Sequence, residues 1–412
     1  MNYKRVGLYG VSSTGKTTIA KRIEDLYPSF KYIDGSVVIG NVCPGGILNF
    51  KKLDTKHKTI YREKAIRFLK QYQIKVQKNL IIAGHYSFMQ SDGTIENVWT
   101  VEDDDFYTDI IYVKDEPNNV YDRCVLRGKI CISPKFTKKW IDYELTSIES
   151  LIKQDIYKIE SNSLDGKLEK IKEIINKLIL NVIVRNIINK TKHKLVILLD
   201  ADGTLIPYDS SQIMSKYLNN INTSEIKKIF KTYKDYCFPA FYDVAKYYSK
   251  NNSYSDFVNA STKSAKEIRI RNEFLDLINN VDATFIIVTA GFYILWEKLI
   301  LKYNFKNVEL IAGNTLYDTC IVGQNEKGYI VDTLKKYNKT VVCFGDALVD
   351  KDMFIKSDKA YLVVNERIKS IIPHINGNDK IQYLSYEDIE IPQMRKTNFT
   401  EIKKKMEELN ND

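Results

Sequence analysis

The chain has 412 residues, 44% of them hydrophobic, and a formal net charge of +10. At roughly 150 residues per domain this length predicts two or three domains, and the apolar content excludes a disordered chain. No apolar run approaches the roughly 18 residues that span a bilayer, and the first residues lead straight into a strand without a signal sequence. We therefore expect a cytoplasmic protein with no membrane partner.

The six cysteines form no CxxC pair, and the four histidines show no zinc-binding spacing. We interpret the cysteines as reduced, mostly buried thiols. The positive charge has two interpretations. It marks an anionic partner such as a phosphate compound or nucleic acid, or it reflects lysines dispersed along the whole chain, which is the interpretation we prefer.

In the N-terminal half, short apolar segments alternate with helical ones. A Gly-rich turn and a helix over about 17–26 follow the first expected strand, and a helix follows Pro117. The expected strands cover residues 3–9, 31–33, 80–83 and 109–113. Such alternation predicts a parallel sheet with helices on both faces, a three-layer α/β domain.

Residues 147–192 have a helical, Lys-rich pattern, after which a second α/β series begins. Its expected strands cover residues 195–199, 284–288, 308–311, 341–344 and 359–364. We expect the tail from 391 to 412 to be helical. The chain is thus predicted to form two three-layer α/β domains over 1–188 and 189–412, the second of them Rossmann-like.

The segment Gly10-Val-Ser-Ser-Thr-Gly15-Lys16-Thr17 follows a strand and opens a helix, the context that supports a phosphate-binding loop. Backbone N–H groups of such a loop converge on nucleotide phosphates at a helix N-terminus. We expect Lys16 to bridge the β- and γ-phosphates and Thr17 to bind Mg²⁺, with ATP or another NTP as phosphoryl donor. The expected nucleotide-binding residues are Gly10, Ser12, Ser13, Thr14, Gly15, Lys16, Thr17 and Thr18.

No acidic residue ends the segment 80–83, whereas Asp34 follows the second expected strand. The chain resembles polynucleotide and nucleoside kinases here, which implies that Asp34 accepts the proton of the acceptor hydroxyl. An exposed turn aspartate before Gly35 is the alternative. The loop 41–46 and His85 are weaker candidates for the acceptor side, and His85 fits a cleft-edge histidine equally well.

Arg123 and Arg127 stand four residues apart, on one face of an expected helix. They resemble the lid arginines of nucleotide-kinase-like enzymes, which implies that they clamp the transferring phosphate. Neutralising this charge is the main requirement of phosphoryl transfer. The alternative is a solvated charged helix face.

In the second half, Asp200-Ala-Asp202-Gly-Thr204 ends an apolar strand and resembles the first motif of the haloacid dehalogenase superfamily. Two carboxylates at this spacing suit a nucleophile, Asp200, and a general acid and base, Asp202. Three further motifs follow in order. Thr289 resembles the hydroxyl that binds phosphoryl oxygens, and Lys327 resembles the lysine that holds nucleophile and phosphate together.

Asp346 and Asp350, in Gly345-Asp346-Ala-Leu-Val-Asp350, resemble the fourth motif and imply a Mg²⁺ site. We expect Asp200, Asp202, Asp346 and Asp350 to contribute to it. The surrounding residues look most like the phosphoserine-phosphatase branch, and a helical cap is expected over about 205–283, where that branch carries one. The many aromatic residues of the cap favour a small helical core over a stacking surface for substrate.

The leading hypothesis is a bifunctional enzyme that joins an ATP-dependent kinase to a Mg²⁺-dependent phosphomonoesterase for small, nucleoside-like or other phosphate esters. Kinase followed by phosphatase is also the domain order of phage polynucleotide kinase-phosphatase, which implies repair of nucleic-acid ends as an alternative. A nucleotide-sensing domain fused to a phosphatase is the third. The predicted cap favours small esters, because a lid excludes polymers as well as water.

Overall fold

The structure, a computed structural model, describes residues 3–233, 236–387 and 389–411. Its contacts divide the chain into a first unit, Met1–Ile175, and a second unit, Asn176–Asp412. The division falls inside helix α8 (Leu164–Lys190), earlier in that helix than the predicted boundary between residues 188 and 189. Within the described part of the chain, none of the helices combines the length and apolarity needed to cross a bilayer.

The first unit contains a five-stranded parallel sheet with the order β2-β3-β1-β6-β7. β1 lies at its centre because it is apolar and buried along most of its length, as a strand covered on both faces must be. The strands are β1 (Arg5–Tyr9), β2 (Phe30–Asp34), β3 (Asn79–Ala83), β6 (Asp109–Lys114) and β7 (Asp155–Glu160).

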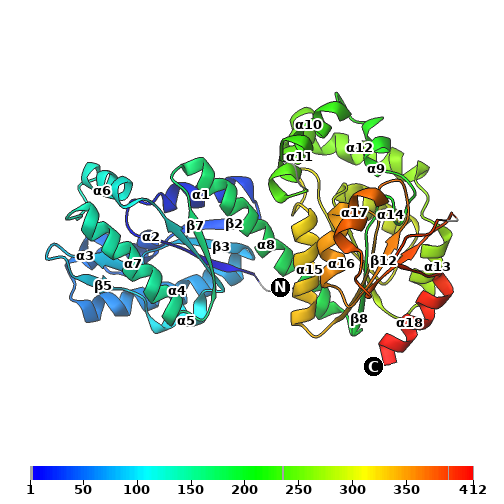
Figure 1. Cartoon of the computed structure of the whole chain (residues 1–412). Helices are drawn as coiled ribbons and strands as arrows, with labels where there is room; N and C mark the ends of the chain where they lie inside the picture. Colours follow the sequence, from blue (N-terminus) through cyan, green and yellow to red (C-terminus); the bar gives the residue numbers. More distant parts are fainter. Residues whose placement is uncertain (1–2, 234–235, 388, 412) are drawn as a thin grey trace. The chain divides into compact units, whose positions relative to one another are not determined.

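Helices cover both faces of this sheet (Figure 1). They are α1 (Lys16–Leu26), α2 (Gly35–Val42), α3 (Gly46–Lys52), α4 (Thr55–Val76), α5 (Val101–Phe106), α6 (Pro117–Leu126), α7 (Pro134–Leu151) and the start of α8. A small antiparallel hairpin joins β4 (Ser87–Met89) to β5 (Ile95–Asn97). The predicted three-layer α/β fold of this half is confirmed.

Strand β7 corrects the prediction that the chain is helical from about residue 147. It pairs in parallel with β6 over its whole length, from Asp155 to Glu160. The sequence of β7 has charged residues at both ends and in the middle, and Ile159 is its single fully buried residue. The strand therefore shows no apolar pattern that would distinguish it from the helical segments around it. An edge strand needs only one covered side, so its apolar signal is weak.

The second unit contains a seven-stranded parallel sheet with the order β10-β9-β8-β11-β12-β13-β14. Its strands are β8 (Leu195–Leu199), β9 (Thr284–Thr289), β10 (Val308–Ala312), β11 (Thr340–Gly345), β12 (Lys359–Val363), β13 (Ile381–Leu384) and β14 (Arg395–Lys396). The last two strands were not predicted. Every residue of β8 and β9 is buried, which makes these strands the core of the unit.

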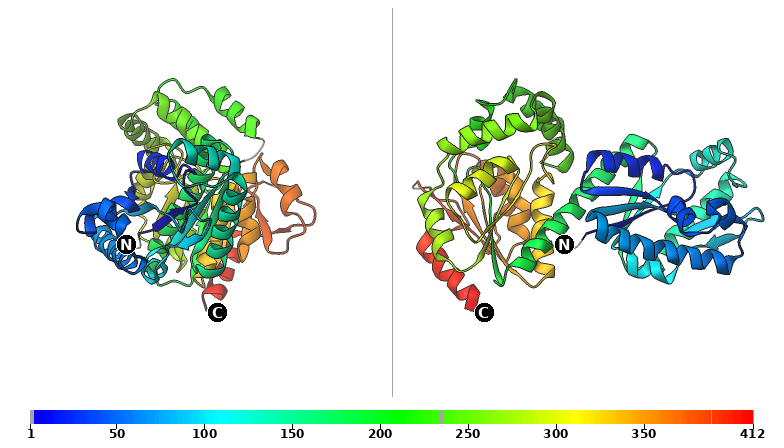
Figure 2. Two further views of the ribbon diagram at one scale, coloured as in Figure 1. Left: turned by 90° about the vertical axis from the view of Figure 1, so that its left-hand side faces the viewer. Right: turned by 180° about the vertical axis from the view of Figure 1, so that it is seen from behind.

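Helices α10, α11 and α12 lie together at one end of this sheet, away from α18 (Figures 1 and 2). The inserted helices are α9 (Ser210–Ser215), α10 (Thr223–Tyr233), α11 (Phe238–Asn251), α12 (Tyr254–Glu267) and α13 (Asn272–Asn280). The others are α14 (Tyr293–Lys302), α15 (Gln324–Lys336), α16 (Lys351–Lys356), α17 (Ile368–Ile375), α18 (Phe399–Asn411) and the 3-10 turn η1 (Leu348–Asp350). The insert is helical, and we refer to residues 205–283 as the cap.

Candidate functional sites

Three carboxylates of the second unit converge at the carboxyl ends of adjacent strands. Asp200 follows β8, Asp346 follows β11, and Asp350 ends the short turn η1. One oxygen from each lies within 4.8 Å of the others, and all three residues are buried. Because β8 and β11 are paired in parallel, their ends meet at one edge of the sheet, and the Asp200 N–H donates to Phe344 O at 2.9 Å.

Lys327 of α15 holds two of these carboxylates together. Its Nζ donates to Asp200 Oδ1 at 2.5 Å and to Asp350 Oδ1 at 2.6 Å, and its side chain has no exposed surface. Burial alone would lower the pKa of Lys327, but attraction to Asp200 and Asp350 outweighs it and raises the pKa. The ammonium is therefore charged, as the sequence motif requires.

The carboxylates repel one another as well as attracting Lys327. Burial and then the charge of Asp200 raise the pKa of Asp350 to about 6, although Lys327 opposes this shift. Burial, followed by the charges of Asp200 and Asp350, raises the pKa of Asp346 well above its ordinary value. Three buried carboxylates beside one ammonium have an excess of negative charge and only oxygen donors, a set that fits a hard divalent cation such as Mg²⁺.

Asp202 lies apart from this carboxylate group. Its Oδ1 accepts from Ser210 N at 3.1 Å and its Oδ2 from Ser210 Oγ at 2.9 Å. The Asp202 carboxylate therefore bonds to the start of the cap, and Asp202 is not among the three residues whose oxygens cluster. Burial, then the charges of Asp209 and Asp200, raise its pKa well above the ordinary value, which favours the protonated form.

Thr289 ends β9, the neighbour of β8, and is buried. Its Oγ1 accepts from Gly291 N at 3.0 Å, which fixes the turn after the strand.

Gly203 shows how closely the loop after β8 approaches the carboxylates. It has φ +89°, and a Cβ there would lie 2.3 Å from Asp346 Oδ2, so only glycine fits.

Two residues that sequence motifs did not identify also contact Asp346. Asn365 Nδ2 donates to Asp346 Oδ2 at 2.7 Å, and Arg367 Nη1 lies 3.5 Å from the same oxygen. Arg367 also lies 3.9 Å from Asp209 Oδ2. Both residues stand in the loop after β12, and their proximity to Asp346 becomes visible only when β11 and β12 pair.

In the first unit, the segment 10–17 wraps the end of β1 and leads into α1. Gly10 has φ +138° and Gly15, the N-cap of α1, has φ +95°, conformations that side chains rarely adopt. Ser12, Ser13 and Thr14 are buried, whereas Thr17 and Thr18 are exposed. The strand, loop and helix thus follow in the predicted order.

Lys16 is folded back onto its own loop. Its Nζ donates to Gly10 O at 2.6 Å and to Val11 O at 2.9 Å. Burial, countered by attraction to Glu144, lowers the pKa of Lys16 to about 7. Binding a nucleotide phosphate would give this ammonium the anionic partner that the loop carbonyls do not supply.

Glu144 of α7 is a buried carboxylate that no sequence motif identifies. Its Oε1 accepts from Ser87 N at 3.0 Å and from Ser87 Oγ at 2.7 Å, and its Oε2 from Tyr112 OH at 3.1 Å. Burial raises its pKa to about 7. Its charge attracts Lys16, so it brings an acidic side chain within electrostatic range of the phosphate-binding loop.

Asp34 ends β2 and caps α2. Its Oδ1 accepts from Ser36 N at 2.9 Å and from Ser36 Oγ at 2.6 Å. Its Oδ2 accepts from Tyr32 OH at 3.3 Å, and the same hydroxyl hydrogen-bonds with Thr17. Tyr32 therefore connects the candidate acceptor base to the candidate magnesium ligand of the loop.

The two predicted lid arginines differ in their surroundings. Arg123 Nε donates to Ser13 O at 2.8 Å and its Nη2 pairs with the buried Asp115, so this side chain touches the phosphate-binding loop. Arg127 is the exposed C-cap residue of α6. The structure thus places Arg123, but not Arg127, against the loop.

His85 also faces the loop, with its Nε2 3.4 Å from Ser12 Oγ. Burial, then the positive charges of Lys16 and Lys129, lower its pKa well below the ordinary value, so the imidazole is neutral. The loop 41–46 joins α2 to α3. Among the described residues, no hydrogen bond or ion pair joins this loop to residues 10–17.

Comparison with known proteins finds a match for part of the chain. The family model described as an AAA domain matches residues 9–130. No curated protein matches the chain.

Among solved structures, the chain is similar to a phospho-aspartyl intermediate analogue of phosphoserine phosphatase, with 19% identity and a TM-score of 0.32 over 52% of this chain and 99% of that one. It is also similar to phosphoserine phosphatase from T. onnurineus, with 12% identity and a TM-score of 0.34 over 52% and 96% of the two chains. A sugar kinase from Janibacter sp. shows 13% identity and a TM-score of 0.29 over 42% and 95%.

The family match confirms the predicted P-loop domain for residues 9–130. The parallel sheet of the second unit confirms the predicted α/β fold of that half. The chain therefore joins a first α/β domain, whose residues 9–130 match the AAA-domain model, to a second α/β domain in which Lys327 links two of three clustered carboxylates.

Proposed function

We propose that the second unit is a phosphomonoesterase with Asp200 as nucleophile. The observation that carries the proposal is the position of Lys327, which bonds to both Asp200 and Asp350 inside a buried carboxylate group. An ammonium at this point pairs with the Asp200 side chain and balances the charge of an incoming phosphoryl group. Among the described residues, Asp200 Oδ2 has no hydrogen-bond partner, which suits attack by this oxygen.

In the proposed reaction, an Asp200 oxygen forms a bond to phosphorus while the bond from phosphorus to the ester oxygen breaks. The leaving oxygen takes the proton of Asp202, whose raised pKa favours the protonated form. Asp202, now ionised, accepts a proton from water, which attacks the phosphoryl-aspartate and releases inorganic phosphate. Thr289 is the proposed donor to the phosphoryl oxygens.

Asp200, Asp346 and Asp350 are the residues that would hold Mg²⁺, since their buried oxygens cluster without an equal number of cations. The bound ion would neutralise phosphoryl charge. Asn365 and Arg367 would keep Asp346 oriented through its second oxygen.

We propose further that the first unit is an ATP-dependent kinase for a small hydroxyl compound. Lys16 and the backbone of residues 10–17 would bind the phosphates, Thr17 would bind Mg²⁺, and Arg123 would balance charge next to the loop. Asp34 is the proposed base for the acceptor hydroxyl. Its support is the Tyr32 hydroxyl, which bonds to both Asp34 and Thr17.

The first experiment measures phosphate release from p-nitrophenyl phosphate and a panel of small phosphate esters, with and without Mg²⁺. Asp200→Asn is expected to abolish release, and Asp379→Asn, at an exposed aspartate, to leave it unchanged. Equal activity of wild type and Asp200→Asn would refute the proposed nucleophile.

The second experiment follows transfer of labelled γ-phosphate from ATP to nucleosides, sugars and 5′-hydroxyl oligonucleotides. Transfer to a small acceptor that fails in Lys16→Met and in Asp34→Asn supports the proposal. Transfer only to oligonucleotides, together with removal of 3′-phosphates, would instead support repair of nucleic-acid ends. ATP binding without transfer to any acceptor would support a nucleotide sensor.

A further inference from the structure

A buried ion network connects α6 and α8 to the phosphate-binding loop of the first unit. Asp115 directly follows β6, and its carboxylate has no exposed surface. Its Oδ2 accepts from Lys167 Nζ of α8 at 2.5 Å and pairs with Arg123 Nη2 of α6. Lys167 is buried as well. Two cations from different helices therefore share one carboxylate, and we call Lys167, Asp115 and Arg123 the loop anchor.

The Asp115 carboxylate is ionised at neutral pH. Burial would raise its pKa, but the hydrogen bonds from Lys167 and Arg123 outweigh burial and lower the pKa. If either cation moved away, a buried negative charge would lose one of its two partners, which is unfavourable. Asp115 therefore ties Arg123 in place, although the Arg123 side chain itself is partly exposed.

The loop anchor ends at Ser13 of the phosphate-binding loop, where Arg123 Nε donates to Ser13 O at 2.8 Å. Ser13 has φ +68°, a left-handed conformation that is unfavourable for a residue with a side chain and persists only where its surroundings hold it. The Ser13 hydroxyl is buried and has no hydrogen-bond partner among the described residues. It is a donor that a phosphate oxygen can satisfy.

Lys16 contacts the same loop in a different way. Its Nζ bonds to two loop carbonyls, at 2.6 and 2.9 Å, and would exchange them for nucleotide phosphates. Arg123 has no such freedom, because moving to a phosphate would break its bonds to both Ser13 and Asp115. When Lys16 turns to the nucleotide, Arg123 therefore remains to hold a loop carbonyl.

We propose that Asp115 and Lys167 are positioning residues for nucleotide binding. They act through Arg123, which they hold against the Ser13 carbonyl so that the loop keeps its phosphate-binding conformation. The inference rests on the proposed kinase function, and it gives Arg123 a fixed place on the loop instead of a place on a moving lid. Because the loop is shaped before the nucleotide arrives, less ordering is needed on binding, and the anchor contributes to affinity more than to turnover.

The test measures the Kd of the full-length protein for MgATP by calorimetry. Asp115→Asn keeps the shape of the side chain but removes its charge. It should raise Kd by about 10- to 100-fold, the range expected when a hydrogen bond between charged groups is lost. In the transfer assay, kcat at saturating ATP should stay within about threefold of wild type, since the anchor acts on binding.

Variants of Arg123 separate a positioning role from a catalytic one. Arg123→Lys keeps the charge but lacks the forked head that reaches two partners, so it should lose as much affinity as Arg123→Met. These two variants decide the inference if Asp115→Asn does not fold, since the Arg123 side chain is 36% exposed. Adding Asp115→Asn to Arg123→Met should cause less than about a threefold further loss, because both changes break the same connection.

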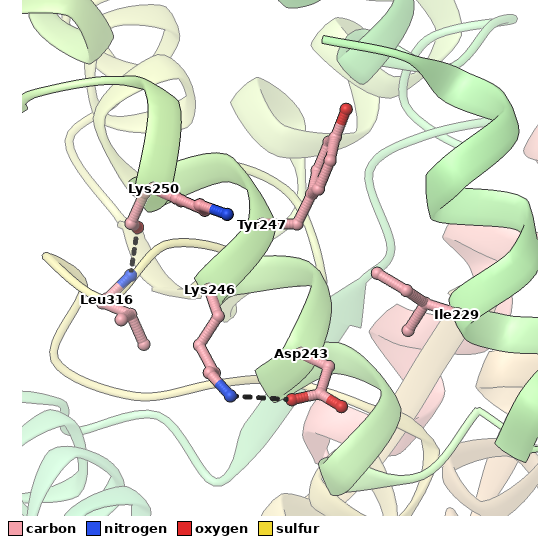
Figure 3. Close-up of a pocket in the computed structure, with 7 residues that line it drawn as sticks. Ile229, Asp243, Lys246, Tyr247, Lys250 and Leu316 are labelled. Atoms are coloured by element: carbon pink, nitrogen blue, oxygen red, sulfur yellow. Dashed lines mark hydrogen bonds and ion pairs between the residues drawn. The ribbon is translucent and has the colours of Figure 1, made fainter. Parts of the chain in front are cut away.

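Two controls remove ion pairs outside the loop anchor. Glu160→Gln breaks an exposed pair with Lys114, the residue before Asp115. Lys246→Met breaks a pair with Asp243 in an open groove of the second unit (Figure 3). Both variants should leave Kd within about twofold of wild type, because exposed ion pairs contribute little.

An unchanged Kd in Asp115→Asn would overturn the inference while leaving the kinase proposal intact. Wild-type affinity in Arg123→Lys, together with a large loss of kcat in Arg123→Met, would also overturn it, because Arg123 would then act by its charge on the transferring phosphate. ATP binding without transfer to any acceptor would refute the kinase, and the Kd values would still decide the inference.

Discussion

Lys327 holds a full positive charge at a place with no exposed surface, between Asp200 and Asp350. A buried ion pair is weak support for stability by itself, but removing one partner leaves an uncompensated charge. The same side chain therefore serves folding and the proposed reaction. Its substitution has consequences for both, and these can be measured separately.

Lys327→Met is expected to destabilise the metal-free second unit by about 3–5 kcal/mol at pH 8, because two buried carboxylates lose their shared ammonium. The loss should shrink as the pH falls to 5, since the raised pKa of the unpaired Asp350 carboxyl lets it protonate. Urea unfolding in EDTA at both pH values measures it. The control is Lys335→Met, on the same helix as Lys327. Because Lys335 forms a largely solvent-accessible ion pair with Asp358, this substitution should change the free energy of unfolding by less than about 1 kcal/mol.

Asp202→Asn tests the proposed general acid through the leaving group. Loss of proton donation should lower kcat on alkyl phosphates by about 10²–10⁴-fold. The loss should be much smaller on p-nitrophenyl phosphate, whose leaving group departs as a stable anion without a proton. Steady-state kinetics on the two ester classes decide this, and an equal loss on both would contradict an acid role.

The position of helix α8 moves the start of the second unit from residue 189 to Asn176. Its C-terminal part belongs to the second unit, where Asn176 is 1% exposed and bonds twice to the backbone of Ile321, each time at 2.8 Å. Ile321 stands in the segment that leads to α15 and Lys327. The helix therefore supports the segment that leads to Lys327, the lysine of the proposed phosphatase site.

A piece that begins at residue 189, the predicted boundary, lacks this support. Relative to residues 164–412, the piece 189–412 is expected to unfold at least about 5 °C lower or to aggregate, because it loses the apolar residues that α8 buries. Thermal unfolding of the two pieces followed by circular dichroism provides the measurement. The buried residues lost include Leu178, Ile179, Leu180, Val184 and Ile187. Equal melting temperatures would show that the second domain begins after α8.

The sequence predicted the elements with a strong local signal, and the site residues that stand beside them. The buried strand β8 was predicted to the residue, and helix α1 begins at Lys16, one residue before its predicted start. Strands β7, β13 and β14 were missed because they are short or lie at a sheet edge. Glu144, Asn365 and Arg367 could not be predicted, since only the pairing of distant segments brings them to the sites.

Each unit has its own sheet and its own candidate site, so we expect the two activities to be separable. Lys16→Met should abolish ATP binding and leave phosphate release within about twofold of wild type. Asp200→Asn should do the reverse. Calorimetric titration with ATP and the phosphate-release assay measure the two functions, and joint loss in either variant would show that the units depend on each other.

The arrangement of Lys327 between carboxylates also constrains how this chain can evolve. If selection for the proposed phosphatase were relaxed, loss of Lys327 alone would leave buried negative charge and lower the folded fraction. Replacement of the whole group by apolar residues of similar volume is tolerated far better. We therefore expect inactive descendants to have lost the lysine together with its partner carboxylates. In their sequences, positions 200, 327 and 350 should be substituted together rather than one at a time.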